Sequence, residues 1–219
     1  MIKRREIKFR LQTCQSGVLE KFLISSSLGF IKHFPDRAVN SVYFDDSVFN
    51  SACDNLLGNS RRTKRRYRWY GSFEDFCFGT FELKQKDGLD GWKENHSITL
   101  SPSLKSFREL KRELISQLPI SENLIMNTMS PEVLIKYNRK YYISFDGSVR
   151  LTVDSDVAYW KISEFNWFQN KKQTANDLEK IIEIKYDSNL ENIVSGSLHE
   201  LMPILSRNSK YTKAVTRLY

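Results

Sequence analysis

Apolar and polar residues alternate along much of the chain, as they do in β-strands that bury one face. The alternation is clearest in Arg4–Gln12, where charged residues alternate with Ile7, Phe9 and Leu11. Further runs rich in β-branched and aromatic residues predict strands at Asn40–Asp46, Arg61–Gly71, Phe76–Lys86, Gly91–Leu100, Glu132–Phe145, Ser148–Ala158 and Leu178–Asp187. The sequence therefore predicts a sheet of about eight strands.

Helical periods occupy segments between these strands. In Ser103–Leu118, apolar residues recur at spacings of three and four with charged residues between them, which predicts an amphipathic helix. Further helices are expected at Val18–Leu28, at Val48–Leu57 immediately before Gly58, and at Leu190–Leu205.

The connections indicate how these elements are organised. The dipeptide Asp146-Gly147 between two predicted strands is a hairpin signal, so we expect mostly antiparallel neighbours. Segment 163–177 shows no clear period and is expected to form a loop. Because no repeat or linker divides the chain, the sequence predicts one α+β domain over residues 1–219.

The alternation also places charged residues on one face of each of four strands, because successive side chains point to opposite faces. For one strand alone, such a face is most simply exposed to solvent. Four strands of this kind favour an eight-stranded antiparallel β-barrel, with helices packed outside and charges lining a polar tunnel. The charged positions are Glu6 and Lys8; Arg62, Lys64, Arg66 and Arg68; Glu82, Lys84 and Lys86; and Glu183 and Lys185.

A tunnel lined by lysine and arginine needs a polyanion, because cations that face one another repel unless something neutralises them. Phosphate chains suit such a lining, since arginine offers paired donors and lysine a mobile point charge. The glutamates on the same faces offer oxygen ligands to Mg²⁺ or Mn²⁺, which bind through a few carboxylates and substrate phosphates. Cations combined with metal-binding carboxylates are typical of phosphoryl transfer.

Composition narrows the function classes further. The formal net charge is +8, from 34 Lys and Arg against 26 Asp and Glu, which also favours an anionic ligand. The three cysteines and three histidines are scattered, which disfavours a zinc site, a disulfide framework and a histidine-based nucleophile. No apolar run approaches the roughly 18 to 20 residues of a membrane span or follows the basic N-terminus, so we expect a cytoplasmic location.

Eight segments form an ordered series along the chain: RREIKF at 4–9, NSVYFDD at 40–46, RRTKRRYRWYG at 61–71, FELKQK at 81–86, KYNRKYY at 136–142, RLTVD at 150–154, EIKY at 183–186 and NSKYTKAV at 208–215. In this order they resemble the vacuolar transporter chaperone (VTC) domain of polyphosphate polymerases, in the triphosphate tunnel metalloenzyme superfamily. The resemblance runs from residue 4 to residue 215 and implies an eight-stranded antiparallel tunnel.

The resemblance implies transfer of the γ-phosphate of ATP to a growing polyphosphate chain, with release of ADP and with Mn²⁺ or Mg²⁺ as cofactor. Glu183 is implied as the metal ligand, with Glu6 and Glu82 as helpers. The phosphate ligands that it implies as the catalytic set are Lys8, Arg66, Arg68, Lys84, Arg139, Arg150 and Lys210. Further substrate-binding positions are Arg62, Lys64, Lys86, Lys93 and Lys185, together with Tyr43 and Tyr211, for which packing is an equal alternative.

The sequence departs from the family pattern in its first strand. Arg5 stands where an aromatic residue is usual, and Arg4 replaces the first glutamate of the fuller ExExK motif, so the metal depends mainly on Glu183. The eukaryotic polymerases also carry phosphate-sensing and membrane domains, and this sequence contains neither. Translocation of polyphosphate would therefore require a separate membrane-protein partner.

Two alternative functions remain open. The first is an inorganic or nucleoside triphosphatase on the same scaffold, which needs the same cations and metal but uses water as the nucleophile. The second is a polyanion-binding module without chemistry, for which the segment RRTKRRYR would suit nucleic acid. Glutamates on the cationic faces disfavour nucleic acid, because they repel phosphate unless a metal intervenes.

Overall fold

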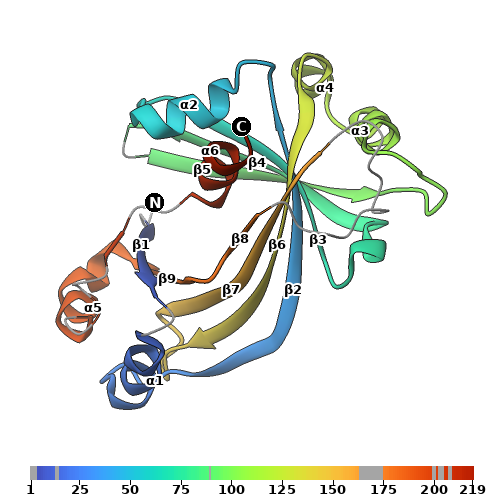
Figure 1. The fold of residues 1–219 in the computed structure, drawn as a ribbon. Helices are drawn as coiled ribbons and strands as arrows, with labels where there is room; N and C mark the ends of the chain where they lie inside the picture. The colour runs from blue at the N-terminus through green and yellow to red at the C-terminus, as the bar shows by residue number, and fades with distance from the viewer. Residues whose placement is uncertain are drawn as a thin grey trace. The chain divides into compact units, whose positions relative to one another are not determined.

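A computed structural model describes residues 4–12, 15–88, 90–162, 175–198, 201, 205–206 and 209–219 (Figure 1). The eight predicted strands are all present, together with a short additional strand. The strands are β1 (Arg4–Leu11), β2 (Ile31–Asp45), β3 (Arg62–Tyr70), β4 (Phe78–Asp87), β5 (Asp90–Thr99), β6 (Ser130–Ile143), β7 (Arg150–Lys161), β8 (Ala175–Asp177) and β9 (Lys180–Asp187). The α-helices are α1 (Ser16–Ser25), α2 (Asn50–Leu57), α3 (Phe107–Ser116), α4 (Ile120–Asn127), α5 (Glu191–Ser197) and α6 (Lys210–Leu218).

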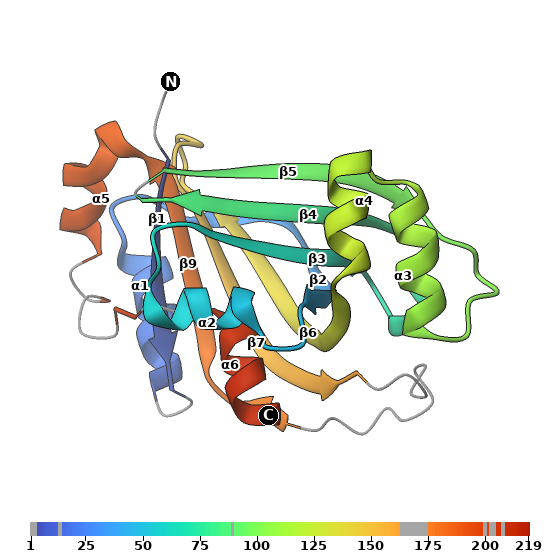
Figure 2. The same cartoon turned by 90° about the horizontal axis from the view of Figure 1, so that it is seen from above.

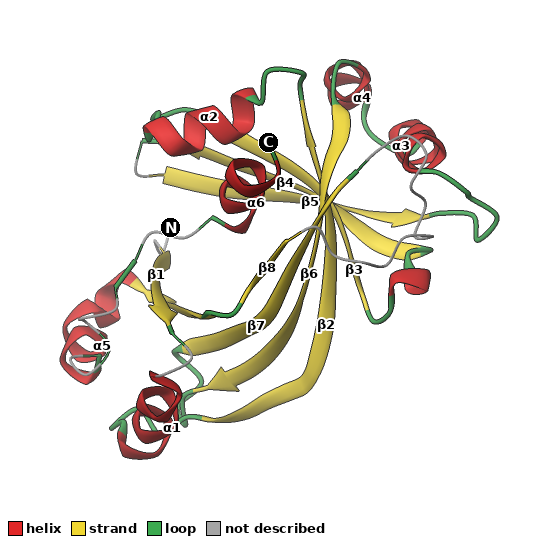
Figure 3. Cartoon of the chain, viewed as in Figure 1, coloured by secondary structure: helices red, strands yellow, loops and turns green. Residues whose placement is uncertain are grey.

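The strands form one hydrogen-bonded sheet in the order β1-β9-β7-β6-β2-β3-β4-β5, and β8 pairs with β7. The pairs β1–β9, β7–β9, β2–β3, β3–β4 and β4–β5 are antiparallel. Figure 3 distinguishes these strands from the helices that accompany them. The predicted α+β class, with an antiparallel path of eight strands, is therefore confirmed.

Contacts divide the chain into two compact units. Unit 1 comprises Met1–Arg37, Tyr137–Val157 and Asp177–Asn208, and unit 2 comprises Ala38–Lys136, Ala158–Asn176 and Ser209–Tyr219. Strands β2, β6, β7 and β8 contribute residues to both units. The expectation of one domain stays a prediction, and each unit is described by itself below.

In unit 1, the apolar face of the β1, β7 and β9 strands is covered by helices α1 and α5 (Figure 1). Phe9 and Ile182 from adjacent strands are fully buried, as predicted from the period-two pattern. Phe22 of α1 and Val194 of α5 belong to the same apolar cluster. Burial of this face leaves the alternate residues of the three strands on a separate polar face.

In unit 2, α3 and α4 cover the apolar face of the β3, β4 and β5 strands (Figure 2). Leu110 and Leu114 of α3 are fully buried, and their spacing of four places them on one face of the helix. Tyr67 and Phe81, paired across β3 and β4, meet this helix layer in one apolar cluster. The short helices α2 and α6 pack against each other beside the other face of β3.

Local signals explain where several helices begin and end. The side chain of Ser106 accepts a hydrogen bond from the amide of Glu109 at the start of α3, so the helix begins at Phe107 rather than Ser103. Ser209 caps α6 in the same way through the amide of Thr212. Gly58 ends α2 with φ of 74°, in the left-handed conformation that glycine adopts without strain, as predicted.

Several predicted boundaries were wrong. Strand β2 begins at Ile31 rather than Asn40. The sequence prediction missed residues 31–37 because they are exposed and show no apolar alternation. In the expected loop 163–177, Ala175–Asp177 forms β8, and residues 163–174 lie outside the described residues.

The helical elements also differ from the sequence prediction. Within the described part of the expected helix Leu190–Leu205, the α-helix covers Glu191–Ser197, and Leu205 instead bridges to Phe9 of β1. The prediction lacks α4 and α6, which span eight and nine residues. Among the described residues, no helix is long and apolar enough to cross a membrane.

Candidate functional site

The polar face of unit 1 is organised around a lysine between two carboxylates. Lys8 lies directly opposite Glu183 in the β1–β9 register. Its Nζ atom is 2.9 Å from a Glu183 carboxylate oxygen and 3.0 Å from a Glu6 carboxylate oxygen. Burial opposes the charged form of Lys8, but Glu183 and Glu6 outweigh that effect and raise its pKa above the ordinary value. Lys185 Nζ adds a second cation, at 3.5 Å from both glutamates.

A buried ion pair adjoins these residues. Asp154 of β7 is fully buried, and Arg139 of β6 donates to its two carboxylate oxygens at 2.5 and 2.7 Å. The Nη2 atom of Arg139 also lies 3.8 Å from Glu183. Arg150 lies opposite Lys185 in the β7–β9 register and is exposed. We call Glu6, Lys8, Arg139, Asp154, Glu183 and Lys185 the unit 1 cluster.

The polar face of unit 2 is organised around a single carboxylate. Glu82 of β4 is only 4% exposed and accepts a hydrogen bond from Arg66 Nε at 2.5 Å. Lys93 Nζ and Arg68 Nη1 lie 2.8 and 3.3 Å from the second oxygen. Burial by itself would raise the pKa of Glu82, but the positive charges of Arg66, Arg68 and Lys93 outweigh burial and lower the pKa to about 2. These four residues form the centre of what we call the unit 2 cluster.

Additional cations lie beside this centre. Lys64 faces Lys84 in the β3–β4 register, and Lys84 faces Lys93 in the β4–β5 register, which places three lysines across adjacent strands. The same registers pair Arg62 with Lys86. Like charges directly opposite one another destabilise a sheet, so an anionic ligand would relieve their repulsion.

Hydrogen bonds to uncharged side chains connect Lys64 with the start of α6. Lys64 Nζ donates to Asn55 Oδ1 of α2 at 2.7 Å and to Ser209 Oγ at 2.8 Å. Asn55 in turn donates to Thr212 Oγ1 of α6 at 2.8 Å. Lys210, a predicted phosphate ligand, is the first residue of this helix.

The two predicted tyrosines stack face to face but direct their hydroxyls differently. The ring centroids of Tyr43 and Tyr211 are 4.8 Å apart, with the ring planes inclined by 10°. Arg66 Nη1 donates to the Tyr43 hydroxyl at 2.9 Å, whereas the Tyr211 hydroxyl donates to Asp45. Tyr43 therefore belongs to the unit 2 cluster, and Tyr211 packs behind it.

The structure brings together some of the predicted metal ligands. Glu6 and Glu183 share the ammonium groups of Lys8 and Lys185, whereas Glu82 belongs to the unit 2 cluster. Two carboxylates of this kind fit a hard divalent cation that takes its other ligands from phosphate and water. Within the described ranges, no group of three or more His, Cys, Asp or Glu residues could hold a metal ion by itself.

The sequence analysis missed two carboxylates, Asp154 in the unit 1 cluster and Asp45 beside the unit 2 cluster. Asp154 has the same parity in its strand as Arg150, so strand alternation could have placed it on the polar face. Asp45 pairs with Tyr211 across a separation of 166 residues, and no local pattern signals that contact.

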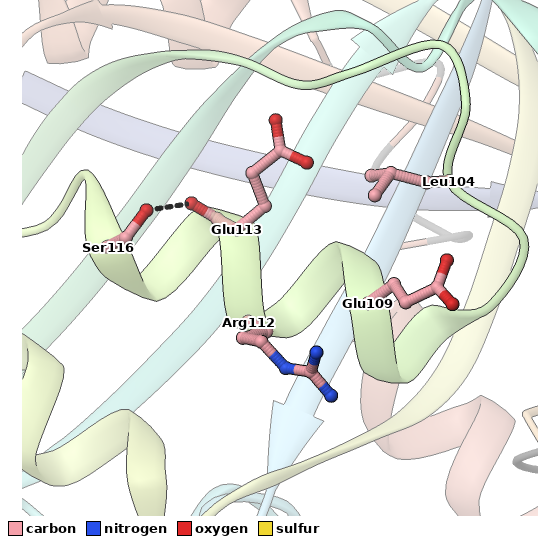
Figure 4. Close-up of a pocket in the computed structure, with 5 residues that line it drawn as sticks. All are labelled: Leu104, Glu109, Arg112, Glu113 and Ser116. Carbon is pink, nitrogen blue, oxygen red and sulfur yellow. Dashed lines mark hydrogen bonds between the residues drawn. The ribbon is translucent and has the colours of Figure 1, made fainter.

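A separate pocket lies along α3 and is lined by Leu104, Glu109, Arg112, Glu113 and Ser116 (Figure 4). Its carboxylates are engaged by backbone amides: Ser101 N donates to Glu113 and Lys105 N to Glu109, both at 2.7 Å. The predicted site residues lie on other elements, so this pocket is not the candidate site.

Comparison with protein families gives a match to the VTC domain over residues 4–219. A curated relative, vacuolar transporter chaperone complex subunit 2 of Saccharomyces cerevisiae, is 26% identical over 160 residues. The match covers 60% of this chain and 19% of the yeast protein, so the chain corresponds to about a fifth of that relative.

Comparison with solved structures identifies the same fold in proteins of low sequence identity. A putative adenylyl cyclase from Hippeastrum, described as having a dominant triphosphatase activity, superposes with a TM-score of 0.53 at 14% identity, covering 97% of this chain and 96% of that one. A putative adenylate cyclase from Bacillus halodurans gives 0.51 at 14% identity, covering 96% and 97%. These likenesses and the strand order confirm the predicted triphosphate tunnel fold.

Proposed function

The chain belongs to the VTC domain family, and on that basis we propose that it transfers the γ-phosphate of ATP to a growing polyphosphate chain and releases ADP. The observation that carries this proposal is the excess of cations in the unit 2 cluster. Arg66, Arg68 and Lys93 surround the single carboxylate of Glu82, and Lys64 and Lys84 lie beside them. Such a surface binds phosphoryl oxygens through charge-assisted hydrogen bonds.

The cations have separate roles in this proposal. Arg66 and Arg68, oriented by Glu82, would bind phosphate groups through the charge-assisted hydrogen bonds that a guanidinium offers to phosphate oxygens. Lysines supply mobile point charges that follow the charge developing on the phosphoryl group. The proposed ligands are Lys8, Arg66, Arg68, Lys84, Arg139, Arg150 and Lys210, with Arg62, Lys64, Lys86, Lys93 and Lys185 as further binding positions.

A divalent cation, Mn²⁺ or Mg²⁺, would be held by Glu183 and Glu6 of the unit 1 cluster. When bound, such an ion neutralises phosphate charge and favours displacement at phosphorus. We assign Glu82 a different role, because it is the single carboxylate among three cations, Arg66, Arg68 and Lys93, whereas Glu6 and Glu183 lie together. In this assignment Glu82 orients the two guanidinium groups.

The reaction follows from the chemistry of the proposed substrates. An oxygen of the terminal phosphate of the acceptor attacks the γ-phosphorus in line, a new P–O–P bridge forms, and the bond to the β-phosphate oxygen breaks to release ADP. The attacking phosphate oxygen is anionic near neutral pH, so no general base is needed. The contribution of the chain is to position and neutralise the two anions.

A triphosphatase is the second candidate, because the structurally similar Hippeastrum protein is described as having that activity. The same cations would serve both reactions, and water would replace the phosphate acceptor. The third candidate, a polyanion-binding module, would use the unit 2 cluster for binding alone.

The yeast relative is a subunit of a vacuolar transporter chaperone complex. We therefore include in the proposal a location on the cytoplasmic face of a membrane, reached through a separate membrane-protein partner. Co-purification of this chain with a membrane protein would test this part independently of catalysis.

Incubation of the purified chain with ATP and Mn²⁺, with products resolved by gel and phosphorus NMR, tests the reaction. Long phosphate chains together with ADP would support the polymerase. Orthophosphate without chains would identify a triphosphatase. Binding of tripolyphosphate without either product would leave the polyanion-binding module.

A further inference from the structure

A chain of four side chains connects α6 with the centre of the unit 2 cluster. In order of contact, they are Asp45 at the end of β2, Tyr211 in α6, Tyr43 in β2 and Arg66 in β3. All four belong to unit 2. We call this set the Asp45–Arg66 chain.

At one end of this chain, Asp45 joins two helices. Its carboxylate is fully buried and accepts hydrogen bonds from the amides of Ser51 and Ala52, at 3.0 and 3.1 Å, in the first turn of α2. It also accepts the hydroxyl hydrogen of Tyr211, which is itself only 1% exposed. A buried carboxylate is stable only when such donors satisfy it, so Asp45 fixes Tyr211 relative to α2.

At the other end, Tyr43 holds Arg66 from one side. The Tyr43 ring is stacked on Tyr211, which limits its rotation, and its hydroxyl accepts a hydrogen bond from Arg66 Nη1. Glu82 accepts a hydrogen bond from Arg66 Nε on the opposite side. The orientation of the Arg66 guanidinium therefore depends in part on Tyr43, whose ring stacks on Tyr211.

We propose that Asp45 and Tyr211 are positioning residues that fix the orientation of Tyr43 and, through it, the phosphate-binding geometry of Arg66. This inference rests on the proposed function only in assigning phosphate binding to Arg66. It replaces a direct substrate-binding role for Tyr211, because the Tyr211 hydroxyl is directed to Asp45. A displacement of about 1 Å in a positioned group is enough to impair phosphoryl transfer or binding.

The first test measures tripolyphosphate binding by calorimetry in the full chain. Tyr211→Phe removes one hydroxyl and keeps the ring, and it should weaken binding about threefold to tenfold. In an Arg66→Ala background, the same substitution should weaken binding less than about twofold, because its effect passes through Arg66. Equal losses in both backgrounds would overturn the proposal.

Tyr67→Phe is the matched control. The Tyr67 hydroxyl is equally buried and donates to the Phe76 carbonyl at 2.7 Å, but it lies on the apolar face of β3. Its removal should lower thermal stability about as much as Tyr211→Phe while leaving tripolyphosphate affinity unchanged. A loss of affinity equal to that of Tyr211→Phe would show that any lost tyrosine hydroxyl has this effect, and would overturn the proposal.

The second test does not depend on a ligand. Burial opposes ionisation of Tyr43, but Arg66 and Arg68 outweigh it and hold the pKa of Tyr43 below its ordinary value. NMR titration of ring-labelled tyrosine should show this pKa rising in Tyr211→Phe and in the second variant, Asp45→Asn, but not in Tyr67→Phe. An unchanged Tyr43 titration in Tyr211→Phe would overturn the positioning role.

The two tests distinguish a failure of the proposed function from a failure of the positioning role of Asp45 and Tyr211. If the wild-type chain binds no tripolyphosphate, the proposed function fails, and the tyrosine titration still decides whether Tyr211 positions Arg66. If tripolyphosphate binds normally to Tyr211→Phe and the titration is unchanged, the positioning role fails and the proposed function stands.

Discussion

The polar faces of the two units use the same residue types but match their charges differently. In the unit 1 cluster, Glu6, Glu183 and Asp154 face three cations, and Lys8 is shared by the two glutamates. In the unit 2 cluster, the single carboxylate of Glu82 faces three cations, with further lysines alongside. The role of a glutamate on these strands, as a metal ligand or as a partner that orients arginines, therefore depends on the number of carboxylates and cations around it.

The difference separates two kinds of binding. In the unit 1 cluster, Glu6 and Glu183 lie close enough to share Lys8 and Lys185, so this pair suits a divalent cation whose added charge substrate phosphate would balance. A cluster with surplus positive charge is completed by an anion, and its carboxylate acts on the arginines. Substitutions and acid should affect the two clusters differently.

Arg66→Ala should reduce phosphate transfer by at least about a hundredfold, as expected for loss of one preorganised donor to a developing charge. The chain should stay folded, because Arg66 lies on the polar face and is partly exposed. Initial rates and circular dichroism measure the two properties. Arg61→Ala is the control, because Arg61 is exposed and pairs with Asp87 at 3.0 Å. Normal rates in Arg66→Ala would remove the unit 2 cluster from the site.

Acid should weaken the unit 2 cluster. The pKa of Glu82 is lowered from 4.5 to about 2, so its stabilising contribution is present above pH 4.5 and is lost as pH falls toward 2. The contribution is at most about 3 kcal/mol. Urea unfolding between pH 2 and 6 measures it. Glu82→Gln should be less stable at pH 6 and lose less stability on acidification, and an identical acid slope in both proteins would contradict this role.

Exchanging the two glutamates for glutamine should separate metal from phosphate binding. Glu183→Gln should raise the Mn²⁺ concentration needed for half-maximal activity by about tenfold or more. Glu82→Gln should leave that concentration unchanged and weaken tripolyphosphate binding, because Arg66 and Arg68 lose their orienting partner. Metal titrations at saturating ATP and calorimetry without metal measure the two effects. Equal shifts in metal requirement would assign both glutamates to one metal site.

The smallest expected effect concerns the three lysines that face one another across β3, β4 and β5, namely Lys64, Lys84 and Lys93. Lys84→Gln should raise the free energy of unfolding by about 0.2–1 kcal/mol, because Lys84 lies opposite both Lys64 and Lys93. The same change should weaken tripolyphosphate binding. Urea unfolding and calorimetry at low salt would show these opposite signs, and reduced stability in Lys84→Gln would show that repulsion does not dominate there.

Strand alternation was sufficient to predict the architecture and most of the polar face. It placed Lys8 with Glu6, and Arg66 with Arg68, because a period of two decides which side chains share a face. It could not show that Glu82 is surrounded by Arg66, Arg68 and Lys93, since that depends on the register between strands. The sequence also could not reveal the role of Tyr211, because this residue lies in α6, a helix that the sequence analysis did not predict.

The sequence separations within the two clusters also imply an order of assembly. Arg66 and Glu82 are 16 residues apart and lie on adjacent strands joined by one connection. Strand β1 meets β9 only across long separations, and Arg10 of β1 contacts Glu179, the residue just before β9, across 169 positions. Because closing a long loop is slow, and synthesis proceeds from the N-terminus, the Arg66–Glu82 pair can form in a nascent chain before β9 exists. Until β9 is made, Lys8 lacks its Glu183 partner, so the proposed metal ligands come together later in synthesis than the Arg66–Glu82 pair.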